Sequence, residues 1–306
     1  MKIGITGATG FIGRHVMYHA QGLGHEMIAY TRRQYGLPVL LAAETLTQPA
    51  TAPHNLPETR LDALVHLAGE TLMGFWTRSK RERIYQSRVD FTRQLVRGLA
   101  AWRPENRPRI LICASGAGFY GDRAGELLDE NSPPGTGFLA ELCVEWEKAA
   151  QEAASLGIRV VNLRTGMVLG NDGGAFPLLC RVFGLGLGGR LGNGRQWTPW
   201  IHVADAAALV VRAVEAGNLH GPLNVCAPQP VTNAEFTRML ATALRRPAIF
   251  HAPALVLRLL LRGMAEEMLL SSQRVNPRVA AELGYHFSHP SLSSALGALL
   301  GAQSGT

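Results

Sequence analysis

The stretch GITGATGFIG, residues 4–13, places three glycines between a short apolar run and the helical pattern of residues 11–24. In a strand–turn–helix context Gly7 permits a tight turn, Gly10 lets a phosphate approach the backbone, and Gly13 allows close helix–strand packing. The helix N-terminus adds N–H groups and partial positive charge. The stretch therefore predicts a pyrophosphate cradle; the alternative is a tight strand–helix turn without a ligand. The residues expected to line this cradle are Gly7, Thr9, Gly10, Phe11, Ile12 and Gly13.

Outward from this turn, β-branched runs alternate with helical patterns, which predicts an α/β fold with a doubly wound parallel sheet. The segment 34–60 is rich in Pro, Thr and Ala and is expected to be an irregular surface loop. The expected strands are 2–6, 26–31, 63–68, 109–115, 159–164 and 222–226, and the expected helices are 11–24, 77–102, 138–156 and 203–216.

Composition excludes several classes of protein. The net charge of +7 comes mostly from arginines spread along the chain, so no basic patch indicates nucleic-acid binding. There is no apolar run of about 18 residues to span a bilayer and no secretory segment, so we expect a cytoplasmic protein without membrane contact. The four cysteines match neither a zinc site nor a disulfide framework, and no metal is expected.

The second expected strand ends in YTRR, residues 30–33. A carboxylate at this position would hold a ribose 2′-OH and repel a 2′-phosphate. Here Arg32 and Arg33 follow Thr31, and a guanidinium suits a phosphate dianion. The sequence therefore favours NADP over NAD, unless the pair are merely surface arginines.

Beyond Arg164 the regular alternation of strand and helix patterns ends, and glycines become frequent. We expect residues 1–170 to form an NAD(P)-binding domain whose sheet is completed by about 200–226. Residues 171–199 and 227–306 are expected to form a smaller, mainly helical C-terminal domain on the substrate side. A cleft between the two would bind the ligand.

The motifs together identify the chain as similar to the extended short-chain dehydrogenase/reductase superfamily. It most resembles the atypical "epimerase family" group of NAD(P)-dependent epimerase/dehydratase-like proteins with their own C-terminal domain. The resemblance implies a Rossmann-type sheet, NAD(P) binding and a possible homodimer. The motifs that carry it are GITGATGFIG (4–13), LVHLAGE (64–70), SRVDFT (87–92), ASGAGFYGD (114–122), FLAELCVEWE (138–147), LRTGMVLG (163–170), GRQWTPWIHVAD (194–205), GPLNVCAP (221–228) and LLSSQRVNPRVAAELGYHF (269–287).

By position in the resemblance, Leu67, Ala68 and Gly69 would line the adenine and ribose side of the cofactor groove. Ser115 falls where the superfamily has its catalytic Ser or Thr, although it could instead be a turn serine. Arg88 stands where an Asn is usual, and Thr31, Arg88 and Ser115 are also expected to contact the cofactor.

The resemblance fails at the active-site Tyr and Lys, which sit four residues apart on the helix after that serine. Phe138 and Leu142 stand at the positions that we assign to them, and no tyrosine of the chain has a Lys four residues on. The usual proton relay is therefore absent. Its possible substitutes are Ser115, Tyr120, Glu141 and Glu70.

Each substitute has a structural alternative. Tyr120 could be a packing aromatic, Glu141 a solvated helix residue and Glu70 a cap. Arg164 and Arg195 could bind an anionic substrate group. The sequence thus predicts an NADP-binding epimerase/dehydratase-like oxidoreductase of an unknown small molecule with a non-standard acid/base. The alternative is an NADP-binding sensor or interaction protein without turnover.

Overall fold

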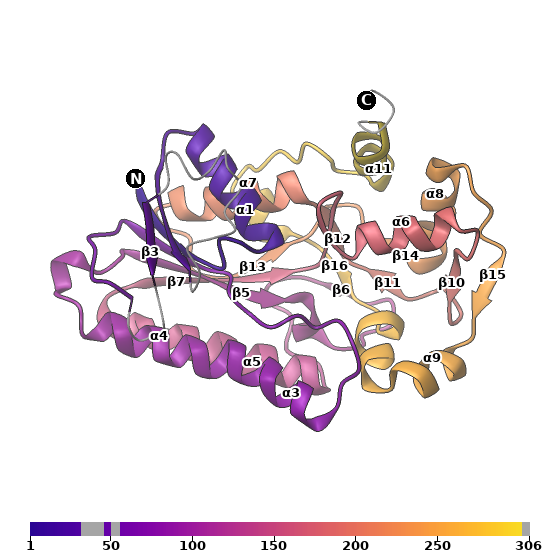
Figure 1. The fold of residues 1–306 in the computed structure, drawn as a ribbon, viewed down its shortest axis with the longest axis horizontal. Coiled ribbons are helices and arrows are strands. Elements are labelled where there is room, and N and C mark those ends of the chain that lie inside the picture. The colour runs from indigo at the N-terminus through magenta and orange to yellow at the C-terminus, as the bar shows by residue number, and fades with distance from the viewer. Residues whose placement is uncertain (32–45, 50–55, 302–306) are drawn as a thin grey trace.

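The computed structural model describes residues 1–31, 46–49 and 56–301 (Figure 1). Its centre is a seven-stranded sheet in which all neighbouring strands are parallel. From edge to edge the strands are β13 (Gly221–Val225), β7 (Arg159–Thr165), β5 (Ile110–Gly116), β4 (Ala63–His66), β1 (Lys2–Thr6), β2 (Glu26–Thr31) and β3 (Leu46–Pro49). The strand order reverses between β1 and β4, and the doubly wound parallel sheet is confirmed.

Helices cover both faces of this sheet (Figure 1). One face carries α1 (Phe11–Gly22) and α7 (Val203–Glu215), and the other carries α4 (Phe91–Ala100) and α5 (Phe138–Gln151). Successive strand residues alternate between the two cores, so that Val65 lies on the α1 side and Leu64 on the α5 side. Burial on both faces explains why these strands are almost continuously apolar.

The expected loop at 34–60 contains β3, a strand that the sequence analysis missed. Its four residues, LTQP, are too few and too polar to give a periodic signal. Arg32 and Arg33 lie outside the described residues.

The long helix expected at 77–102 forms as three consecutive segments. Thr77 caps α3 (Arg78–Tyr85) by accepting a hydrogen bond from the Lys80 N–H. A π-helical segment, η2 (Gln86–Asp90), then leads into α4. Such a π turn shifts the helix register and is frequent at functional sites.

The C-terminal region gathers at one end of the molecule, on the right in Figure 1. There α6 (Phe176–Gly184), α8 (Asn233–Leu244) and α11 (Leu292–Gly301) pack around the buried Trp200. The predicted capping box opens α8, since Thr232 and Glu235 exchange hydrogen bonds. Among the described residues, no helix is long and apolar enough to span a membrane.

The remaining elements are short. They are η3 (Pro104–Asn106), η4 (Ala117–Tyr120), β6 (Leu127–Leu128), η5 (Glu152–Leu156), β8 (Met167–Gly170), β9 (Gly173–Gly174), β10 (Gly189–Leu191), β11 (Trp197–Thr198), β12 (Trp200–His202), β14 (Val231–Thr232), β15 (Phe250–Ala252), α9 (Ala254–Leu261), η6 (Ala265–Leu270), β16 (Arg274–Val275) and α10 (Arg278–Glu282).

Candidate functional site

The glycine turn has the geometry of an anion cradle. Gly7 has φ +78°, and a Cβ on Gly13 would lie 2.1 Å from the Gly7 carbonyl oxygen. A Cβ on Gly10 would meet only that oxygen, at 3.1 Å, so the outer side of Gly10 is open. Among the described residues no side chain caps α1, and its first turn carries no carboxylate. The free N–H groups and the open approach fit a diphosphate.

The loop after β4 lies against this turn. The Leu67 N–H donates to the Thr6 carbonyl oxygen at 3.1 Å. A Cβ on Gly7 would lie 2.7 Å from the Ala68 nitrogen, so the two backbones touch. Gly69 follows, beside the guanidinium of Arg88. The residues that the resemblance assigned to the cofactor groove are thus neighbours at the carboxyl ends of β1 and β4.

The adenosine side of the cradle is described only up to Thr31, which is buried at the end of β2. The choice between a 2′-hydroxyl and a 2′-phosphate was predicted from Arg32 and Arg33, which lie outside the described residues.

Ser115 begins a buried polar network at the carboxyl end of β5. Its hydroxyl donates to Glu147 Oε1 at 2.8 Å. Arg164 binds the same carboxylate through Nε and Nη2, each at 2.9 Å. The pair is desolvated, with 5% of the Arg164 side chain and 12% of the Glu147 side chain exposed. The charge of Arg164 is therefore balanced by Glu147 within the protein. This pairing speaks against the suggestion that Arg164 binds an anionic substrate group.

Tyr120 lies behind this network and has no exposed surface. Its hydroxyl donates to Asn224 Oδ1 at 2.7 Å and accepts from Arg164 Nη1 at 3.2 Å. Burial raises the pKa of Tyr120 to about 12. The role of proton donor predicted for Tyr120 is therefore corrected to that of a packing and hydrogen-bonding residue.

Helix α5 presents a different pair of residues to Ser115 than the pair predicted. Leu139 packs on Gly118, where a Cβ would meet it at 3.0 Å, and the Cys143 thiol donates to the Gly116 carbonyl oxygen at 3.7 Å. Phe138 instead packs edge-on against Trp76, and Leu142 is buried in the α5-side core.

The α5 positions assigned to the superfamily's Tyr and Lys are thus corrected by one residue, from Phe138 and Leu142 to Leu139 and Cys143. The conclusion about chemistry is unchanged, because the new pair also lacks a phenol and an amine. Burial raises the pKa of the Cys143 thiol to about 11, so the thiol is neutral near pH 7.

The two other predicted carboxylates do not join the network. Glu70 accepts a hydrogen bond from Lys80 at 2.7 Å, and this bond lowers the pKa of Glu70, which remains ionised. Glu141 is exposed on α5, two residues from both Leu139 and Cys143. At 100° per residue it projects from the opposite side of the helix.

Glu147 is the residue that the sequence analysis missed. Its signal was the helical spacing, because it stands four residues after Cys143 and eight after Leu139, on the same face. Glu147 lies on the helix face that meets the carboxyl end of β5. It is therefore a better candidate for proton transfer than Glu141, which was chosen only because it precedes Leu142 in the sequence.

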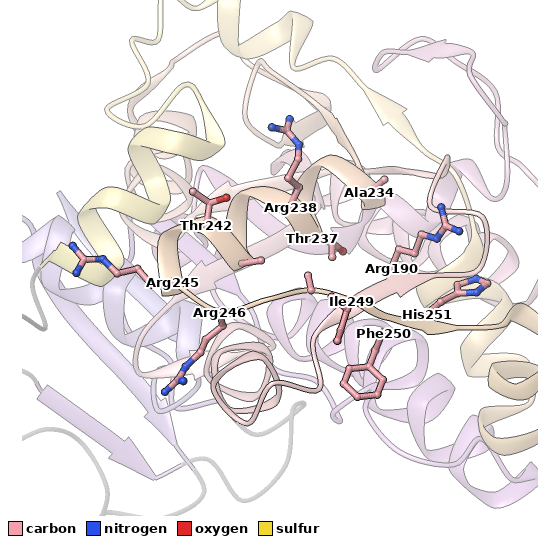
Figure 2. A pocket seen from close by; sticks show the side chains of 12 residues that line it. Arg190, Ala234, Thr237, Arg238, Thr242, Arg245, Arg246, Ile249, Phe250 and His251 are labelled. Carbon is pink, nitrogen blue, oxygen red and sulfur yellow. The ribbon is translucent and has the colours of Figure 1, made fainter.

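Among residues 1–31, 46–49 and 56–301, no group of three His, Cys, Asp or Glu side chains could hold a metal. A groove of about 620 Å³ runs along α8 and β15. Figure 2 shows that its arginines Arg190, Arg238, Arg245 and Arg246 point away from one another, so they do not converge on one anion.

Comparison with known proteins extends these observations. Residues 3–226 match the model of the NAD dependent epimerase/dehydratase family, and residues 252–299 match a domain of unknown function, DUF1731. The crystal structure of human epimerase family protein SDR39U1 (isoform 2) with NADPH has a TM-score of 0.88 and 33% identity, over 98% of this chain and 99% of that chain.

Two bacterial proteins are similar over almost the whole chain. Epimerase family protein YfhF of Bacillus subtilis is 33% identical, over 98% of this chain and 98% of its own length. The nucleoside-diphosphate sugar epimerase of Corynebacterium glutamicum is 34% identical with a TM-score of 0.79, over 99% of this chain and 58% of that chain. The glycine turn, the sheet and these matches agree, and the chain belongs to the NAD dependent epimerase/dehydratase family.

Proposed function

We propose that this protein is an NADP(H)-dependent oxidoreductase of epimerase/dehydratase type. In this proposal Ser115 and Glu147 transfer the proton for which the superfamily uses a Tyr–Lys pair. The NADPH in the crystal structure of the human relative and the sequence YTRR, residues 30–33, support the choice of cofactor.

The cofactor would be held by the residues of the glycine turn and of the loop after β4. When bound, it supplies a hydride donor or acceptor. Gly10 would give the cofactor phosphates access to the N–H groups of α1. Ala68 and Gly69 follow β4, the strand between β1 and β5. Arg32 and Arg33 would take the 2′-phosphate.

Ser115 and Glu147 can move a proton because the Ser115 hydroxyl already points its hydrogen at the carboxylate. In this proposal a substrate hydroxyl donates to a lone pair of Ser115 Oγ. As that O–H bond breaks, Ser115 takes the proton and passes its own proton to Glu147 Oε1. The reverse sequence protonates a substrate oxygen. Arg164 holds the carboxylate in place from the other side through its two hydrogen bonds.

The single observation that carries the proposal is the 2.8 Å hydrogen bond between Ser115 and Glu147 at the carboxyl end of β5, two strands from β1 in the sheet. The test is a screen of small carbonyl and hydroxyl compounds on NADPH- or NADP-loaded protein, read at the nicotinamide absorbance. With a substrate identified, Ser115→Ala should lower kcat by roughly 10²–10⁴, the usual contribution of a general acid or base.

The matched control is Glu141→Gln, a carboxylate of the same helix on the opposite side. It should leave kcat within about twofold of the wild-type value, since it makes no contact with the relay in this proposal. If Ser115→Ala does not reduce turnover, the relay is wrong.

The second candidate function is an NADP-binding sensor without turnover. The observation that favours it is the apolar and neutral pair, Leu139 and Cys143, on the α5 face toward Ser115. A broad screen without turnover on protein that still binds NADPH would select this function.

A further inference from the structure

Arg88 is a buried cation between α5 and the loop after β4. It lies in the π-helical segment η2, and only 9% of its surface is exposed. Its guanidinium carbon lies 5.2 Å from the centroid of the Trp146 ring. On the other side, the same carbon would be 3.4 Å from a Cβ on Gly69, and the two terminal nitrogens would be 3.5 and 3.6 Å from it. The guanidinium therefore lies directly beside Gly69 of the loop after β4.

The hydrogen bonds of Arg88 are few and long for a buried cation. Within the part of the chain that the structure describes, Nη1 donates to the Ile84 carbonyl oxygen at 3.5 Å and to Ser87 Oγ at 3.4 Å. The nearby carboxylate of Glu70 takes its short hydrogen bond from Lys80. Burial lowers the pKa of Arg88, yet a guanidinium keeps its charge at every pH that a protein tolerates.

Arg164 shows what a satisfied buried arginine looks like in the same protein. It makes two 2.9 Å bonds to a carboxylate and two further bonds to Tyr120 and to the Glu130 carbonyl oxygen. Burying a cation without such partners is costly, so a fold keeps one there only for a reason. A ligand oxygen that arrives on binding would supply a further acceptor.

The sheet order tells which part of the cofactor Arg88 would meet. A dinucleotide crosses the switch point with its phosphates at the β1–α1 turn and its adenosine toward β2. The nicotinamide mononucleotide half then extends over β4 and β5. Gly69 follows β4, and Trp146 belongs to the helix that packs on β5, so Arg88 lies on this half.

We propose that Arg88 supplies the positive charge on the nicotinamide side that the missing lysine of α5 would supply. Its guanidinium donates to the sugar–phosphate oxygens of the nicotinamide mononucleotide half, reaching them past Gly69. This role rests on the proposed NADP(H) binding. It adds that the positive charge is carried by the π-helical segment η2 before α4, and not by α5.

The test compares NADPH with 2′,5′-ADP, a fragment that carries the adenosine and the 2′-phosphate but lacks the nicotinamide half. Dissociation constants are measured by calorimetry for the wild type, Arg88→Met, Arg88→Lys and the control Arg93→Met. Arg93 lies on the next turn and pairs with Glu145 at the surface. Melting temperatures without ligand are recorded for all four proteins.

Arg88→Met should weaken NADPH by about 10- to 100-fold, as expected for a hydrogen bond to a charged group. The dissociation constant of 2′,5′-ADP should stay within about twofold of the wild-type value. The melting temperature should not fall, because an apolar side chain replaces a poorly bonded buried cation. Arg88→Lys should regain part of the NADPH affinity. Arg93→Met should change the dissociation constant of neither ligand.

Equal losses for both ligands, or no loss for either, would overturn this role for Arg88 while leaving NADP(H) binding intact. A wild-type protein that binds neither ligand would overturn the NADP(H) assignment itself, and this role with it. If Arg88→Met does not fold, Arg88→Gln retains a donor toward Ile84 and is read by the same NADPH-to-2′,5′-ADP ratio.

Discussion

A bulky side chain at Gly10 should separate cofactor binding from folding. Gly10 precedes α1 with φ −73° and ψ 167°, which is extended backbone that any residue adopts. An added Cβ would meet only the Gly7 carbonyl oxygen within 4 Å, at 3.1 Å. Gly10→Val should therefore cost at most about 1 kcal/mol of stability, comparable to an unfavourable N-cap residue. In a chain of this size that cost lowers the melting temperature by about 2 °C.

The same side chain would occupy the space through which a phosphate reaches the N–H groups of α1. Losing two charge-assisted hydrogen bonds costs about 3–6 kcal/mol, so NADPH should bind roughly 10²–10⁴-fold more weakly. In a thermal-shift assay at 100 times the wild-type Kd, NADPH stabilises the wild type by about 2.7 kcal/mol. The variant should show almost none of that shift.

Gly13→Ala is the contrasting variant. Its Cβ would lie 2.1 Å from the Gly7 carbonyl oxygen, so α1 would have to move, and the melting temperature itself should fall. A Gly10→Val protein that melts normally and keeps the full NADPH shift would refute the assignment of this turn as the phosphate cradle.

Three other predictions concern specificity, the network and pH. NADP(H) should bind more tightly than NAD(H), and Arg32→Ala should remove most of that difference in calorimetric titrations; equal wild-type affinities would refute it. Arg164→Met leaves Glu147 buried without its partner and should destabilise the protein by about 3–5 kcal/mol in urea unfolding, whereas a loss below 1 kcal/mol would contradict the buried pair. Burial lowers the pKa of His66 to about 4, so the folded state resists protonation that the unfolded chain accepts below about 6.5. Stability should therefore fall by up to ~3 kcal/mol as pH drops from 6.5 to 4, and His66→Gln should reduce this slope in melts at several pH values.

Local pattern was sufficient to predict most of the fold. The glycine turn, the alternation of strands and helices and the capping box at Thr232 each depend on neighbours within about ten residues. The short polar strand β3 gave no such signal and was missed.

The candidate site depended on contacts that no local pattern reveals. Adjacent helix positions differ by 100°, so FLAELCVEWE is compatible with either Phe138 or Leu139 facing the sheet; packing against Gly118 decides it. Tyr120 stands close to Ser115 in sequence, but η4 turns its ring into the core. The bond between Glu147 and Arg164 joins residues 17 positions apart, on α5 and β7.

The most direct measurement of the central claim is the rate of NADPH oxidation, or NADP reduction, by wild type and Glu147→Gln across a panel of small carbonyl and hydroxyl compounds. We expect turnover of at least one compound by the wild type, with kcat reduced roughly 10²–10⁴-fold in the variant and the NADPH Kd unchanged. Wild-type protein that binds NADPH but turns over no compound would contradict the enzyme assignment. Turnover that Glu147→Gln leaves intact would contradict the Ser115–Glu147 relay.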